Sequence, residues 1–233
     1  MAPSANEAAR EERVGLLLVW WLAALAGAVD ACGLFQLNDL YVSFMSGNTT
    51  SMAAALARGD VARVGLIGGI IAAFVAGCAA GTVVGELTAR RHVPVIVFAA
   101  AAVLILPVVV PRWTILSMTF AMGMLNATIR RAGPVDVTVT YVTGTLAKLG
   151  RGLGLLLCGR ARDWTWLWQA VTWLGLVAGA ALATFARLRI GDATLMALPV
   201  LAVLIAAASW FARPEDAGPE TAGPETAAAV DRR

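Results

Sequence analysis

Charged side chains are scarce in this sequence. Asp, Glu, Lys and Arg together make up 14% of the 233 residues, whereas 59% of the residues are hydrophobic. A water-soluble domain carries about a quarter charged residues, so the composition excludes an ordinary soluble protein. The net charge of +3 is small, and the basic residues fall in short loops between apolar runs instead of forming a nucleic-acid-binding surface. No nucleic-acid partner is therefore predicted.

Residues that usually perform catalysis or bind metals are also scarce. The chain has one histidine, His92, and three widely separated cysteines, Cys32, Cys78 and Cys158. The cysteines form no CxxC pair, and no second histidine or nearby group of carboxylates accompanies His92. The sequence also has no phosphate-binding loop and no nucleophile–histidine–acid set. It therefore predicts no enzyme activity, no metal site and no cofactor.

Long hydrophobic runs take the place of these groups. Several approach the roughly 20 residues that a helix needs to cross a bilayer core of about 30 Å. They predict spans at about 14–35, 64–87, 93–110, 114–129, 168–186 and 193–211. The sequence therefore predicts an all-α polytopic protein of the cell (inner) membrane, with the lipid bilayer as its partner. The distribution of Lys and Arg over the loops favours cytoplasmic termini at both ends.

Two polar segments interrupt this hydrophobic chain. The first reads Tyr41-Val-Ser-Phe-Met-Ser-Gly-Asn-Thr-Thr50, and the second reads Thr138-Val-Thr-Tyr-Val-Thr-Gly-Thr-Leu146. Phe44-Met-Ser-Gly47 in the first matches Tyr141-Val-Thr-Gly144 in the second, position by position. Each segment combines a β-branched and aromatic run with a following apolar helical pattern. The sequence predicts a strand-like run and then a short helix at both places.

The similarity between the two halves extends beyond these segments. Gly27-Ala-Val-Asp-Ala31 resembles Gly123-Met-Leu-Asn-Ala127, and Val75-Ala-Gly77 resembles Val177-Ala-Gly179. Three matches in the same order predict an internal repeat. The predicted organisation is a disordered cytoplasmic leader at 1–13, membrane repeats at 14–111 and 112–212, and a disordered C-terminal tail at 213–233.

The direction of the second repeat depends on how the polar segments enter the membrane. If each enters and leaves on one face, the chain has about six transmembrane helices and the two repeats are inverted. If each crosses fully, there are about eight crossings and the repeats are parallel. Both arrangements satisfy the positive-inside trend. The inverted arrangement is favoured, because it brings the two polar segments to one central site.

The glycine-containing motifs are the candidate binding site. A helix N-terminus within the membrane carries a partial positive charge and can bind an anion. The same hydroxyl and amide groups can instead cap the helix, which leaves a purely structural interpretation open. A buried cation would add charge to the site. The candidate substrate-binding residues are Ser46, Gly47, Asn48 and Thr49 in the first segment, and Thr143, Gly144, Thr145 and Lys148 in the second.

Asp30 is the candidate for proton coupling, because an intramembrane carboxylate can carry a proton. Its counterpart in the second repeat is Asn126, which does not titrate. Any coupling would therefore be asymmetric between the halves. Access to water at the helix end, or pairing with Lys148, is the structural alternative for Asp30.

Asp30 and the segment Phe44-Met-Ser-Gly-Asn-Thr49 resemble the signature of the YoaK-like family of bacterial membrane proteins, over residues 14–212. The resemblance implies membrane location and about six spans, and it implies no particular substrate. The strand-then-short-helix pattern is also similar to central elements of the sulfate and uracil permease folds, an architectural analogy over two short stretches.

The function predicted on this basis is secondary transport of a small polar, anionic solute between the two motifs. A passive channel on the same scaffold and a non-transporting membrane adaptor are the alternatives. A homodimer is a candidate assembly.

Overall fold

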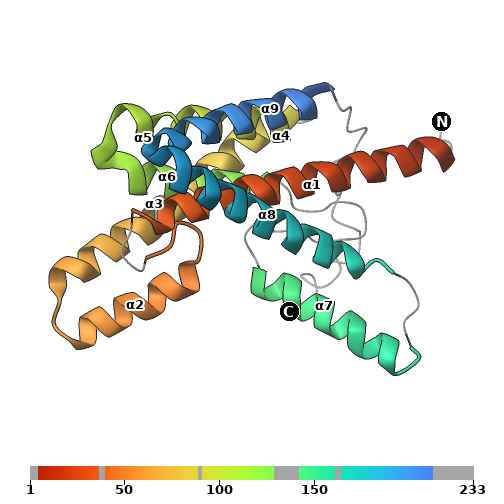
Figure 1. Ribbon diagram of the computed structural model, residues 1–233, viewed down its shortest axis with the longest axis horizontal. Coiled ribbons are helices and arrows are strands. Elements are labelled where there is room, and N and C mark those ends of the chain that lie inside the picture. The colour runs from red at the N-terminus through yellow and green to blue at the C-terminus, as the bar shows by residue number, and fades with distance from the viewer. Residues whose placement is uncertain (1–4, 37–39, 89–90, 129–141, 161–163, 212–233) are drawn as a thin grey trace, which may run out of the picture.

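The computed structural model of the chain describes residues 5–36, 40–88, 91–128, 142–160 and 164–211. These residues form α-helices, short 3-10 turns and connecting loops, and no strand occurs among them. Figure 1 shows the long helices α1 (Ala5–Leu34) and α8 (Leu167–Ile190) crossing in the middle of the molecule. Helix α1 begins inside the segment 1–13 for which disorder is predicted.

The other elements follow in chain order. They are α2 (Met45–Ala57), α3 (Val61–Thr88), α4 (His92–Val103), α5 (Leu106–Val109), the 3-10 turn η2 (Pro111–Trp113), α6 (Thr114–Asn126), α7 (Val142–Leu157), the 3-10 turn η3 (Gly191–Met196) and α9 (Ala197–Phe211).

Four helical stretches are long and apolar enough to cross a membrane. They are Arg13–Leu34, Val61–Thr88, His92–Val109 and Leu167–Phe211. The last stretch has 45 residues and contains both α8 and α9, which η3 separates. This confirms the prediction of a helical membrane protein, although the stretches do not correspond one to one with the predicted spans.

Glycines allow α1 to lie directly on α8. A Cβ atom placed on Gly27 of α1 would be 3.0 Å from the backbone nitrogen of Ala180, and it would also overlap the carbonyl of Leu176. Gly179 of α8 is equally close to the backbone of Ala24 on α1. Small residues at such crossings let two helix backbones approach, which stabilises helix pairs in lipid through close packing.

Helices α3 and α6 pack in the same way. Gly77 and Gly81 of α3 lie against the backbones of Phe120 and Met124 on α6. In return, Gly123 of α6 lies against the backbone of α3, where an added Cβ would be 2.8 Å from the nitrogen of Cys78. Gly77 and Gly81 therefore form a packing face of α3 against α6.

The strand-like run predicted before α2 is wrong. Residues 40–44 form an irregular connector with a bend at Val42 and Ser43. A strand needs a neighbouring backbone to pair with, and here side chains take that role. The matching run predicted at 138–141 lies outside the described residues.

Candidate functional site

The connector between α1 and α2 is held from one side by Asp30. One carboxylate oxygen of Asp30 accepts the backbone N–H of Ser43 at 3.0 Å, and the other accepts the Ser43 hydroxyl. Ser43 is buried, and Asp30 lies in the last two turns of α1. The carboxylate therefore provides a hydrogen-bond acceptor for the N–H of Ser43, which lies outside the helices.

Asn48 holds the same connector from the other side. Its side-chain Nδ2 donates to the carbonyl of Tyr41 at 2.7 Å, and its Oδ1 accepts the N–H of Tyr41 at 3.0 Å. The side chain of Asn48 is 0% exposed. An amide that bonds both groups of one residue reproduces the pairing that an adjacent strand would provide. The connector thus needs no strand partner at Tyr41.

The start of α2 differs from the predicted polar cap. Phe44 occupies the N-cap position and makes no side-chain capping bond. The hydroxyls of Thr49 and Thr50 bond backwards within the helix, to the carbonyls of Met45 and Ser46. Gly47 leaves room for the Phe44 ring, which packs edge-on against Tyr41 with centroids 5.3 Å apart. The side chains of this motif therefore organise the connector and do not cap the helix.

The four predicted residues of the first motif differ in exposure. Asn48 is fully buried and Gly47 is half-buried, whereas Ser46 and Thr49 are exposed. Ser46 and Thr49 are therefore the members whose side chains are open to the surroundings. Asn48 is committed to the backbone of Tyr41.

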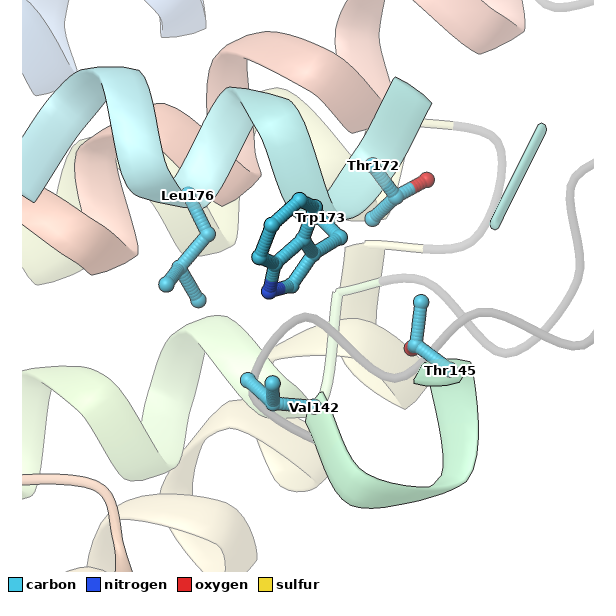
Figure 2. A pocket seen from close by; sticks show the side chains of 5 residues that line it. All are labelled: Val142, Thr145, Thr172, Trp173 and Leu176. Carbon is cyan, nitrogen blue, oxygen red and sulfur yellow. The ribbon is translucent and has the colours of Figure 1, made fainter. Parts of the chain in front are cut away.

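The second motif forms the first turns of α7. Thr143 and Lys148 are exposed, and Gly144 and Thr145 are half-buried. Thr145 lines a small pocket between α7 and α8 together with the residues in Figure 2, namely Val142, Thr172, Trp173 and Leu176. The pocket has a volume of about 10 Å³, which is about the space that one water molecule needs. In this conformation it is too small for an organic solute.

Helices α2 and α7 extend toward opposite ends of the molecule. In Figure 1 each has its N-terminal end nearer the middle, and its C-terminal end leads outward to the turn before α3 or α8. The pocket beside Thr145 is lined by α7 and α8 alone, so it does not join the two motifs. Residues 129–141, which precede α7, lie outside the described residues.

The two candidate coupling positions have different partners. Asp30 bonds to Ser43, as described above, and the amide nitrogen of Asn126 donates to the carbonyl of Met122 at 2.8 Å on its own helix. The predicted alternative partner of Asp30, Lys148, lies exposed on α7. The part of the chain that the structure describes contains no group of three His, Cys, Asp or Glu residues that could hold a metal ion.

Sequence reasoning missed the partners of these polar residues. Neither Ser43 nor Tyr41 was among the candidate site residues. The available signal was that a lone Asp and a lone Asn flank the same non-helical run in an apolar chain. Each needs a hydrogen-bonding partner when buried, and unpaired backbone in a connector provides one.

Long apolar helices packed through glycine, together with the polar connector, define an α-helical integral membrane protein. The chain belongs to the family described as Protein of unknown function (DUF1275), which matches residues 18–208. It is 40% identical over 205 residues to the UPF0700 transmembrane protein RA0705 of Rhizobium meliloti (strain 1021), covering 88% of this chain and 90% of that protein. No solved structure matches the chain.

These matches confirm the predicted membership of a membrane-protein family without an assigned activity. The YoaK-like name and the analogy to permeases are not tested by them and stay predictions.

Proposed function

We propose that this protein is a small secondary transporter for a polar, anionic solute, which binds near the N-terminal ends of α2 and α7. The observation that carries the proposal is the connector at residues 40–44, held by the side chains of Asp30 and Asn48. Backbone that is not helical is tolerated at membrane depth only inside protein or beside a wet cavity. Transporters use such interrupted helices to form their binding sites.

Helices α2 and α7 are proposed to enter the membrane only partly. With 13 and 16 residues, they span about 20 and 24 Å at 1.5 Å per residue, less than the hydrocarbon core of about 30 Å, although length alone does not separate them from α6, which has 13 residues. We propose about six crossings, made by α1, α3, α4 with α5, α6, α8 and α9. Both termini are then cytoplasmic, in an inner membrane.

The glycine contacts support an internal repeat. Gly27 lies against Leu176 and Ala180, and its predicted counterpart Gly123 lies against Phe74 and Cys78. Phe74 and Cys78 hold the positions in α3 that Leu176 and Ala180 hold in α8. Each half therefore places its first helix on the small-residue helix of the other half. This exchange is what two copies related by a twofold axis would produce.

The exposed groups of α2 and α7 favour an anion as solute. Ser46 and Thr143 supply hydroxyl donors, and Lys148 supplies positive charge in the second turn of α7. The N-terminal ends of the helices add partial positive charge. Asp30 is proposed to couple transport to protons, since protonation of its carboxylate removes an acceptor from Ser43 and releases the connector.

Flux into proteoliposomes tests the proposal. A panel of small anions, nucleobases and amino acids is applied with and without a proton gradient. Accumulation against a solute gradient is expected. Dissipative flux alone would instead indicate a channel, and no flux of any solute would indicate the adaptor.

A matched pair of variants locates the site. Lys148→Gln is expected to reduce accumulation about tenfold, the cost of one charge-assisted hydrogen bond. Arg160→Gln removes an equally exposed cation beyond the outer end of α7 and is expected to leave transport unchanged. Equal transport by the two variants would show that Lys148 does not take part in binding the solute.

A further inference from the structure

An apolar groove runs along the outside of the molecule between α4 and α9. It is lined by Pro94, Val95 and Phe98 in the first two turns of α4 and by Trp210 in the last turn of α9, and it has a volume of about 430 Å³. Phe98 and Trp210 are 55% and 46% exposed. The groove thus lies beside the start of one helix and the end of another, which places it near one surface of the membrane.

One end of the groove carries a positive charge. The guanidinium carbon of Arg91, the residue before α4, lies 4.1 Å from the centroid of the Trp210 ring. Stacking uses the flat face of a guanidinium, and its N–H donors point outward in the plane of the group. These donors have the fork geometry that binds phosphate through two hydrogen bonds.

We propose that this groove binds an anionic phospholipid, with one acyl chain along Val95 and Phe98 and the phosphate on Arg91. The chemistry of the lining selects the occupant: four apolar residues accept the chain, and a cation beside the indole accepts the headgroup. None of the four lining residues is acidic, so the groove offers no partner to the ammonium of a choline headgroup. A net negative headgroup such as phosphatidylglycerol is therefore preferred.

This site is separate from the proposed transport site, because α4 and α9 contain none of the motif residues. Failure of the flux experiment would leave it standing, and loss of the lipid site would leave the transport proposal standing.

Native mass spectrometry of the purified full-length protein tests the inference. The protein is released from micelles that contain equal amounts of phosphatidylglycerol and phosphatidylcholine. The expected result is one retained phosphatidylglycerol per chain, with about tenfold preference over phosphatidylcholine. Arg91→Gln is expected to abolish the preference, and Arg91→Lys is expected to keep most of it because the charge remains.

Arg112 supplies the matched control. It also lies near a tryptophan, with its guanidinium carbon 5.9 Å from the ring centroid of Trp113, but neither residue lines the groove. Arg112→Gln is expected to retain lipid like the wild type, whereas Val95→Trp, which fills the groove, is expected to lose it. Equal retention by Arg91→Gln and the wild type would overturn the proposal. A lipid-free dimer that dissociates in the Val95→Trp variant would also overturn the proposal, because a second copy of the chain would then occupy the groove.

Discussion

The side chains of buried Asn48 and half-buried Asp30 take the place of a missing strand beside α2. Asn48 bonds to both backbone groups of Tyr41, and Asp30 bonds to the backbone and hydroxyl of Ser43. The bilayer core contains no water that could form hydrogen bonds with the backbone groups of Tyr41 and Ser43. The conformation of the connector therefore depends on the side chains of Asp30 and Asn48.

Replacement of Asn48 by Ala should destabilise the protein strongly. The change leaves the N–H and the carbonyl of Tyr41 without their partner, and a buried unsatisfied group costs about 1–3 kcal/mol. Unfolding by SDS titration in mixed micelles should show a free energy of unfolding lower by about 2–4 kcal/mol. Thr49→Ala is the control, because that exposed hydroxyl bonds only to a carbonyl of its own helix. Similar stability of the two variants would mean that Asn48 does not hold the connector.

Asp30→Asn separates the structural role of Asp30 from proton coupling. The amide keeps an acceptor for the Ser43 N–H, and an amide already occupies the related position at Asn126, so the variant is expected to fold. It cannot titrate in the physiological range. Under the proposed function, proton-driven accumulation in proteoliposomes is lost while exchange of solute between the two sides persists. Accumulation equal to that of the wild type would refute the coupling role of Asp30.

At the scale of helices, two pairs depend on glycines that face a backbone. Helices α1 and α8 form one pair, and α3 and α6 form the other. The energy of such pairs in lipid comes from close packing, because the lipid tails remove the hydrophobic driving force between helices. A single methyl group at the crossing point should therefore be costly.

Gly77→Ala should weaken the pair formed by α3 and α6. Its Cβ would overlap the backbone carbonyl of Phe120, so the helices must move apart. Overpacking of this kind costs about 1–3 kcal/mol, measured as a lower free energy of unfolding in the same SDS titration. Gly68→Ala on the same helix meets nothing within 4 Å. This control should be neutral or more stable by about 0.5–1 kcal/mol, the helical preference of Ala over Gly.

At the scale of the whole molecule, the proposed inverted repeat fixes the membrane face on which two turns lie. With inverted repeats, the turn after α2 and the turn after α7 lie on opposite faces of the membrane. With about eight crossings and parallel repeats, both turns lie on the same face. The two arrangements therefore differ in a directly measurable property.

Cysteine labelling distinguishes these arrangements. Native Cys158 is exposed at the turn after α7, and Ala57→Cys, made with all three native cysteines replaced, puts one thiol at the exposed end of α2. In intact cells, an impermeant maleimide is expected to label Ala57→Cys from outside. A second variant keeps Cys158 and has Cys32 and Cys78 replaced. In that variant the reagent should label Cys158 only after the membrane is permeabilised. Labelling of both from the same side would exclude the inverted arrangement.

Much of the fold could be predicted because lipid-spanning helices satisfy their own backbone. A long apolar run specifies a helix without reference to its neighbours, which is why α1, α3, α8 and α9 fall close to predicted spans. The connector could not be predicted in the same way. Its conformation depends on Asp30, which is 13 residues from Ser43, and the β-branched composition alone suggested a strand. The second predicted strand-like run, at 138–141, lies outside the described part of the chain.

The amino-acid sequence alone determined the membrane setting, the apolar helices and the few polar residues that must find partners. Those properties follow from composition and local periodicity, since the bilayer imposes them on each segment separately. Only the tertiary structure decided which partners the polar residues find, which glycines face which backbones, and that a connector stands where a strand was expected. These depend on contacts between segments distant in the chain, so no local pattern contains them.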